Sequence, residues 1–500
     1  MEQLTWTGDL GNIINPIFFA LIIVFAIAVV GQIIASFAFP VGREIADPGG
    51  IPKIENGPQE YVGMAVHYSF FAIVGLIILY LLIGLVTSVE TSGIIGNISD
   101  QLLPVWVSLL ILYIVSIRYK RRLGLYGKLF DNPVGMIGFG LLMFWVFAAL
   151  FADQIVTHDA LSQVSGMKNK FPGTPVRGQE GSYYLLGGDN LARDVFSRLI
   201  VGAQEVLKIA PAATVFAFMV GITLGLPAGY YGGRLDTILS FAANLVLAFP
   251  VILLFYLLVT PEIRETGVIT WLAGVLFIFP VIFLWVLLYS RWRISPKVLT
   301  RVAAPIVIVL LMIYFGTVFE MDPFVGIWTG IMGYLNQGNP IGEWMTATAD
   351  GHSPLLYLPL DANKLNIFVA VVFVNSPTIF RIVRGLTMDI QTRDYVAAAQ
   401  TRGEGPWYIM LWEILPNARG PLIVDFCLRI GYTTILLGTL GFFGLGLSPE
   451  SPDWGSTINE GRKLLSVYVH PALPPALALM SMVLGLNLLA DGLREESLKD

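Results

Sequence analysis

The chain has 500 residues, of which 55% are hydrophobic and only 13% are charged, with a formal net charge of −5. A soluble globular domain carries about 25% charged residues, so this composition excludes an ordinary soluble protein and predicts an all-α, polytopic integral membrane helical bundle. Cys427 is the single cysteine, which excludes an intrachain disulfide and a paired-cysteine metal or redox site.

Apolar segments that are long enough, or nearly long enough, to cross a hydrocarbon core of roughly 30 Å follow one another along the chain. They lie at about 15–40, 65–89, 102–117, 133–153, 207–231, 236–259, 267–290, 302–319, 364–380, 421–447 and 472–490. We therefore expect about eleven membrane spans.

Basic residues indicate the orientation of these spans, because short cytoplasmic loops are enriched in Lys and Arg. They gather at 118–128, 291–301 and 381–419, whereas the N-terminal stretch and the 90–100 loop have none. Eleven spans place all three clusters inside if the N-terminus lies outside and the C-terminus lies in the cytoplasm. Residues 154–206 and 320–363 then form long outside connections, the second with Trp328, Tyr334 and Trp344 as interfacial anchors.

A polar segment, YVAAAQTRGEGPWYIMLWEILPNARGPL at 395–422, interrupts the apolar runs. Its alanines predict a short helix at 394–402 that Asp394 could cap. Gly403 and the Gly405-Pro406 pair predict the end of that helix, and a second amphipathic helix at 407–415 would end at Pro416. Two interpretations follow: an interfacial helix on lipid headgroups, or a docking element for a cytoplasmic partner.

This segment resembles the EAA loop of ABC-importer permeases. Three alanines, one glycine and a closing Leu-Pro stand at the family's spacing, although Ala397 replaces the usual Glu and Glu413 replaces the usual Ile. The resemblance implies that the segment docks ATPase subunits by shape and through Arg402, Glu404 or neighbouring charges. The implied ATPase-coupling residues are Asp394, Tyr395, Ala397, Ala398, Ala399, Arg402, Gly403, Leu415 and Pro416.

Other stretches resemble the dipeptide/oligopeptide/nickel type of these permeases, in the oligopeptide C-subunit branch. They are the start at 131, GGDNLARDVFSRLIVGA at 187–203, and the stretches 224–250, 442–462 and 487–498. Within 187–203, Gly188 and Ala192 replace the usual Thr and Gly, so the turn there could differ from the family's.

The resemblance implies a six-helix type I importer core with two additions. Residues 1–130 add three N-terminal spans. Residues 131–206 hold the first core span and the long outside loop, and 207–260 hold core spans 2 and 3. Residues 261–360 insert two spans with an outside loop, and 361–500 hold core spans 4 to 6 with the coupling loop.

The function implied by the resemblance is a pore subunit without catalytic residues of its own. It would move peptides or a related small solute across the cytoplasmic membrane of a prokaryote by alternating access. No Walker A pattern occurs in the sequence, so ATP and Mg are expected on partner ATPases, with no cofactor or metal on this chain. The implied partners are a second, different permease subunit, two cytoplasmic ATPase subunits, an extracytoplasmic solute-binding protein and membrane lipid, but no nucleic acid.

Two alternatives from other classes stay open at this stage. One is a secondary transporter or channel that is not coupled to an ATPase, which would need ionisable residues or unwound helices near mid-membrane. The other is a membrane anchor of an energy-converting complex.

Several residues near the span ends invite a functional or a structural interpretation. Asp453, Trp454 and Gly455 could form an extracytoplasmic gate or contact the binding protein, or serve as an interfacial anchor. Two other pairs of charged residues are spaced one helical turn apart, which predicts ion pairs between Asp425 and Arg429 and between Glu205 and Lys208. Both are favoured as structural pairs. Glycines in the core spans, among them those at 221, 225 and 229, predict close helix contacts.

Overall fold

The computed structural model describes residues 3–38, 44–45, 53–54, 58–176, 179, 181–293, 295–319, 362–445 and 451–497. The aromatic anchors expected at Trp328, Tyr334 and Trp344 lie outside the described residues. The chain forms two compact units. The first comprises Met1–Ser108, Phe151–Ile200 and Leu464–Pro471; the second comprises Leu109–Leu150, Val201–Lys463 and Ala472–Asp500.

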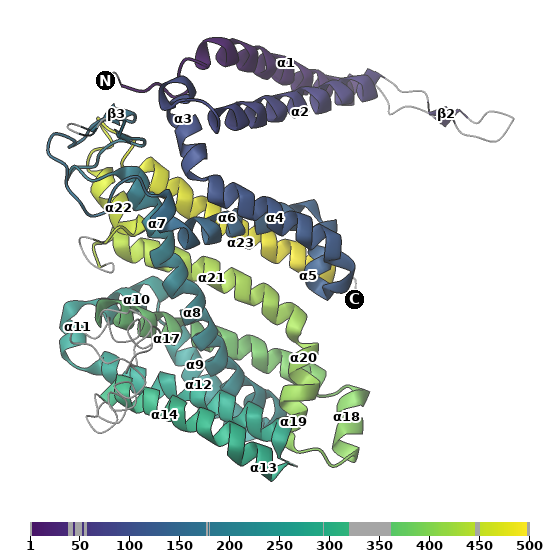
Figure 1. The fold of residues 1–500 in the computed structure, drawn as a ribbon. Coiled ribbons are helices and arrows are strands. Elements are labelled where there is room, and N and C mark those ends of the chain that lie inside the picture. The colour runs from purple at the N-terminus through teal and green to yellow at the C-terminus, as the bar shows by residue number, and fades with distance from the viewer. Residues whose placement is uncertain are drawn as a thin grey trace. The chain divides into compact units, whose positions relative to one another are not determined.

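The first unit is built around a helical hairpin of two long apolar helices, α1 and α2, which pack along each other (Figure 1). The N-terminal residues are fixed to two later segments of the same unit. The Leu4 amide donates to the Gly173 carbonyl (2.9 Å), and the Ile94 amide donates to the Thr5 carbonyl (3.0 Å). The start of the chain therefore lies against the long loop that follows Phe151. The elements are α1 (Gly11–Ala38), β1 (Glu44–Ile45), β2 (Lys53–Ile54), α2 (Pro58–Gly84), α3 (Val89–Gln101), the first part of α4 (Leu103–Tyr119), α7 (Ala152–Ile155), β3 (Thr174–Pro175), β4 (Tyr183–Tyr184) and the first turns of α8 (Val195–Tyr231).

The second unit is a bundle of long helices, in which the first long helix that lies wholly within the unit packs against the C-terminal helix. The helix α6 lies along α23, and α23 lies along α21. The elements beyond those already given are η1 (Lys120–Arg122), α5 (Gly124–Lys128), η2 (Leu129–Asp131), α6 (Pro133–Leu150), α9 (Gly233–Leu247), α10 (Val251–Val259), α11 (Pro261–Glu265), α12 (Val268–Trp292), α13 (Pro296–Val298), η3 (Leu299–Ala303), α14 (Ala304–Phe319), α17 (Ala362–Ile390), α18 (Asp394–Thr401), α19 (Pro406–Tyr408), η4 (Ile409–Ile414), α20 (Leu415–Asn417), α21 (Arg419–Phe442), α22 (Trp454–Arg462) and α23 (Leu473–Ser497).

Close contact between α8 and α17 depends on three glycines spaced one helical turn apart, as the sequence predicts. A Cβ added to Gly221 would lie 2.5 Å from Ile379, and one added to Gly229 would lie 2.6 Å from Thr387. A Cβ added to Gly225 would lie 2.9 Å from the Val383 side chain. Small residues at this spacing let two backbones approach closely, which is how helices pack where lipid provides no hydrophobic driving force.

Nine helices in the described part of the chain are long and apolar enough to span a membrane. The expected 236–259 span is different: it is a pair, α9 and α10, bent by 81°. Pro250 stands at the break and cannot continue a helical hydrogen-bond ladder. The expected 302–319 span corresponds to α14, of 16 residues, whose Tyr314 hydroxyl donates to the Gly274 carbonyl of α12 at 2.7 Å.

The helix α8 starts at Val195 rather than at 207, so the motif at 187–203 runs directly into a long apolar helix. Asp194 explains this start, because its carboxylate accepts bonds from the Ser197 amide (3.0 Å) and hydroxyl (2.6 Å). A capping carboxylate satisfies amides that have no partner in the first turn of a helix.

Candidate functional site

The predicted coupling segment folds into two short helical pieces at one end of the second unit (Figure 1). The first piece, α18, is seated on η4 by Val396 and Ala399, which are both fully buried. The intervening residues Ala397 and Ala398 are exposed, and Tyr395 is 39% exposed. An eight-residue helix thus presents a small-residue face to its surroundings.

Gly403 ends α18 in a left-handed conformation, with φ +79°. Its amide donates to the Gln400 carbonyl (2.9 Å), and the Glu404 amide donates to the Ala399 carbonyl (3.3 Å). This pair of bonds is a Schellman motif, which favours glycine at the position of Gly403. The predicted helix end is confirmed, but the predicted cap is wrong: Arg393 is the N-cap, and Asp394 is the first helical residue. Asp394 lies too late in the helix to cap it and instead adds negative charge to its first turn.

The second piece is continuous with a membrane span. It starts at Pro406, widens into a π-helix over Ile409–Ile414 and runs through Pro416, where the sequence predicts an end. Proline lacks an amide hydrogen, and the π turn before it shifts the hydrogen-bond register so that the helix continues. Ala418 alone then separates α20 from α21.

Polar contacts tie the segment together at its surface. The Arg402 guanidinium lies 2.8 Å from the Glu413 carboxylate, with the Arg402 side chain 55% exposed. The acid that replaces the family's isoleucine therefore pairs with Arg402, one of the charges that the resemblance implies for partner docking. The Gln400 amide donates to the Tyr230 hydroxyl of α8 at 3.2 Å.

The helix α17, which precedes the coupling segment in the chain, is connected to α9 by two arginine side chains. Arg384 forms a two-pronged ion pair with Asp236, with one nitrogen–oxygen distance of 2.6 Å, and Arg381 donates to Asn244 at 2.9 Å. Sequence reasoning missed this link, because the partners lie far apart in the chain and on different helices.

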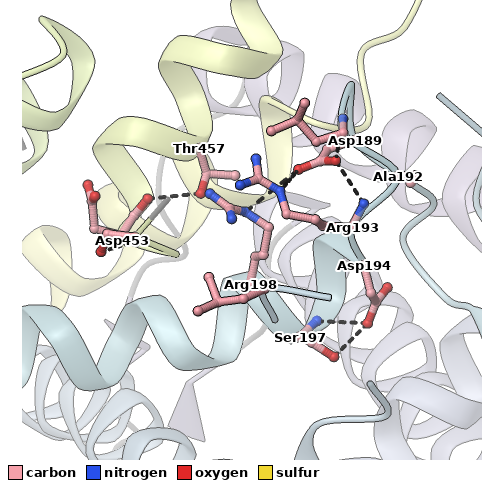
Figure 2. Close-up of polar contacts among 12 residues, drawn as sticks. Asp189, Ala192, Arg193, Asp194, Ser197, Arg198, Asp453 and Thr457 are labelled. Atoms are coloured by element: carbon pink, nitrogen blue, oxygen red, sulfur yellow. Dashed lines mark hydrogen bonds and ion pairs between the residues drawn. The ribbon is translucent and has the colours of Figure 1, made fainter. Parts of the chain in front are cut away.

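The second candidate site, Asp453, Trp454 and Gly455, is a buried corner in this structure. The Asp453 carboxylate caps α22 by accepting from the Ser456 amide at 2.9 Å, and the Thr457 hydroxyl donates to the Asp453 carbonyl at 2.9 Å (Figure 2). Trp454 is 1% exposed and packs edge-on against Trp145, with ring centroids 5.0 Å apart. A Cβ on Gly455 would lie 2.2 Å from the Gly438 carbonyl. The role of these residues as a gate or binding-protein contact stays a prediction.

A cavity of about 20 Å³ lies beside this corner, lined by Glu205 and Asp453 among mostly apolar side chains. That space suits one water molecule. Glu205 approaches Lys208 at 3.7 Å, as its sequence spacing predicts, and it also pairs with Lys364 at 2.8 Å, which sequence reasoning missed. The other predicted pair, Asp425 and Arg429, is present at 3.4 Å.

In the first unit, the motif at 187–203 forms a buried polar cluster around Asp189 (Figure 2). The Asp189 carboxylate accepts from the Arg193 amide (2.9 Å) and guanidinium (2.7 Å) and lies 3.8 Å from Arg198. Both arginines are almost completely buried, at 2% and 0% exposure. A buried charge persists only when it is paired, so this cluster holds the loop in one shape.

The turn inside this cluster keeps a left-handed residue although it lacks the family's glycine. Ala192 has φ +64°, and its carbonyl accepts a bond from the Tyr184 hydroxyl at 3.1 Å. Burial, with the neighbouring charges of Asp194 and Asp189, raises the pKa of Tyr184 far above its usual range, so it remains a donor.

No group of three or more metal-ligating side chains occurs among the residues that the structure describes.

Comparisons with known proteins agree with this picture. Residues 298–495 match the family described as "Binding-protein-dependent transport system inner membrane component". The chain is 26% identical over 347 residues to the glutathione transport system permease protein GsiD of Pectobacterium atrosepticum, covering 69% of this chain and 80% of the relative.

Two further relatives are similar over most of their length. The dipeptide transport system permease protein DppC of Alkalihalophilus pseudofirmus is 24% identical over 370 residues, 74% of this chain and 87% of the relative. GsiD of an Escherichia coli strain is 27% identical over 354 residues, 70% and 81% of the two chains. The family match begins inside 261–360, so the predicted domain boundaries stay predictions.

Proposed function

Because the chain is a multi-pass membrane permease of the ABC-importer class, we propose that Asp394–Pro416 is the segment through which separate ATPase subunits drive it. One observation carries the proposal: α18 has a fixed, buried footing and an exposed outer face, and the helical run after it continues into α21 through Ala418. A surface built in this way can receive a partner and pass its movement to a span.

The mechanism follows from two packings of the bundle that differ by a few kcal/mol in free energy. When the partner ATPases close on ATP and Mg, α18 to α20 move with them, and the spans change from an inward-facing to an outward-facing arrangement. When the ATPases open after hydrolysis, the spans return. This chain contributes contacts and movement, while the partners contribute the chemistry.

The solute and the remaining partners follow from the relatives and from charge. Relatives named for glutathione and dipeptide transport support a small peptide or peptide-like solute. We propose delivery by an extracytoplasmic binding protein and pairing with a second, different permease subunit. Arg291 and Arg293 lie at the same end of the second unit as Arg402, which supports placing that end in the cytoplasm. We also propose a cytoplasmic C-terminus and an outside N-terminus, from the distribution of basic residues along the sequence.

The experiment uses Gly403→Val, with Gly385→Val as a matched control. Both glycines have no atom within 4 Å of an added Cβ, but only Gly403 has a positive φ. A left-handed conformation costs a non-glycine residue roughly 1–2 kcal/mol, and more for a β-branched side chain, so Gly403→Val opens the turn. We expect it to lose ATPase co-purification and uptake of labelled dipeptide or glutathione in proteoliposomes, whereas Gly385→Val keeps both. Full ATPase binding and transport by Gly403→Val would refute the proposal.

A further inference from the structure

The end of α12 contacts the second coupling helix, although α12 lies in the segment 261–360 that the sequence sets apart from the core. The Trp412 indole Nε1 donates to the Ser290 Oγ at 3.0 Å. The Arg291 guanidinium carbon lies 5.3 Å from the centroid of the Trp412 ring. One indole is therefore held at its edge by a hydrogen bond and on its face by a cation.

The acceptor of this bond is itself held in place. The Ser290 hydroxyl donates to the Leu287 carbonyl at 2.9 Å, and Ser290 is only 8% exposed. A fixed, nearly dry acceptor makes the bond to Trp412 directional and costly to lose, because the unpaired group would stay away from water.

A second contact lies at the start of the same helical run. A Cβ built on Gly405, the N-cap residue of α19, would come within 2.6 Å of the Arg293 guanidinium. The end of α12 thus meets the run at its beginning and again at Trp412, inside the π-helix. Single π turns in helices occur frequently at functional sites.

The contacts of α12 and α18 with this run use different residues. The helix α18 is seated by Val396 and Ala399, whereas α12 reaches the run through Trp412 and Gly405. Figure 1 shows α19 with α18 on one side and the α12–α13 end on the other. A movement imposed on α18 therefore reaches α12 through the helix that lies between them.

We propose that Ser290 and Arg291 are positioning residues that clamp Trp412, so that the coupling segment moves α12 together with α21. This inference rests on the proposed function. It gives the inserted helices a part in transmission: α12 carries α14 with it through their packing and the bond from Tyr314 to Gly274.

The test removes the hydrogen bond from either side. Trp412→Phe keeps an aromatic face for Arg291 and removes the donor, and Ser290→Ala removes the acceptor. With the ATPases and binding protein in proteoliposomes, we expect each variant to transport about fivefold less solute per ATP hydrolysed, as for a lost bond of about 1 kcal/mol. The double variant should be no worse than either single variant, because both remove one interaction.

Trp271→Phe is the matched control, since Trp271 lies near the other end of α12 and is 76% exposed. It should keep the wild-type ratio of solute to ATP. Wild-type coupling in Trp412→Phe and Ser290→Ala, or independent losses that add in the double variant, would overturn the clamp. If Trp412→Phe fails to assemble with the ATPases, Ser290→Ala alone tests the clamp, because it removes one hydroxyl group and should leave the protein able to assemble.

The Gly403→Val variant distinguishes a failure of this inference from a failure of the proposed ATPase-coupling function. If Gly403→Val loses ATPase binding while the Ser290 and Trp412 variants couple normally, only the clamp is wrong. If Gly403→Val also binds and transports normally, the coupling function itself is wrong.

Discussion

The coupling helix α18 and the cluster around Asp189 are both polar segments next to membrane spans, but they hold their charges in opposite ways. Around Asp189, two arginines are buried and directed at one carboxylate. On α18 and at its two ends, the charged side chains of Arg393, Asp394 and Arg402 are exposed, and the helix is seated by the apolar side chains of Val396 and Ala399. Buried, paired charge gives a segment one shape, whereas exposed charge on a narrow footing leaves a surface that can meet a partner.

Among the substitutions that test this comparison, Asp189→Ala should have the largest effect on the stability of the folded protein. It leaves Arg193 and Arg198 buried without their shared carboxylate, and removing one partner of a buried ion pair typically costs about 3–5 kcal/mol. We expect a sharp fall in folded yield and in the unfolding temperature of the purified protein. Asp159→Ala, at an exposed position of the same loop, is the control; equal loss in both would show that the cluster is not special.

A pair of neighbouring alanines sharpens the comparison on α18. Ala399→Leu forces a larger side chain into a fully buried position and should destabilise the seat of α18 by about 1–3 kcal/mol. Ala398→Leu, on the exposed face, should leave the unfolding temperature unchanged and weaken ATPase binding instead. Thermal unfolding and ATPase co-purification, measured on both variants, separate the two effects; identical profiles would contradict the assigned faces.

A smaller and opposite effect is expected in the rigid cluster from Ala192→Gly. A non-glycine residue in the left-handed region costs about 1–2 kcal/mol, and the added flexibility of glycine in the unfolded chain offsets roughly 0.5–1 kcal/mol of the relief. The net gain should lie between zero and about 1.5 kcal/mol, visible as a small rise in unfolding temperature. A fall would mean that the Ala192 methyl group packs productively.

The ion pair on the coupling segment should contribute less to stability than the buried seat of α18 at Ala399. Arg402 is more than half exposed, and exposed pairs are worth about 0.2–1 kcal/mol and are screened by salt. Arg402→Ala and Glu413→Ala should therefore change unfolding little at low salt and not at all at high salt. A loss that persists in high salt would mean that the two residues act through packing.

The smallest effect concerns pH and His470. Burial lowers the pKa of His470 below its usual value of about 6.5, so the unfolded chain binds its proton more readily than the folded chain. Stability from this group is present above about pH 6.5 and is lost as the pH falls below it. Unfolding temperatures measured across that range should fall more steeply for the wild type than for His470→Gln; parallel curves would exclude His470 as the source.

Local features of the coupling segment could be predicted from the sequence because they depend on neighbouring residues. The alanine run, Gly403 and the Gly405-Pro406 pair set the first helix, its end and the next start. The cap at Asp394 and the stop at Pro416 were wrong, because the N-cap lies one residue earlier and a π turn accommodates the proline. Such adjustments depend on the register of the whole helix.

Contacts between distant segments could not be predicted from one sequence. Nothing in the order of residues links Ser290 to Trp412, Glu205 to Lys364, or Leu4 to Gly173. Each pair is brought together by helix packing, and the side chains involved are common types at unremarkable positions. The family resemblance predicted the type of protein, while these contacts belong to this chain.

Because Ala418 alone separates α20 from α21, a movement of the coupling segment would tilt α21 about that residue. With 24 residues, α21 is about 36 Å long. A tilt of about 10° at Ala418 would displace its far end by roughly 6 Å, given a rise of about 1.5 Å per residue. At that end, a Cβ added to Gly441 would lie 2.4 Å from the Asp453 carboxylate, and one added to Gly455 would lie 2.2 Å from the Gly438 carbonyl. A displacement of this end of α21 would therefore act directly on the corner around Trp454.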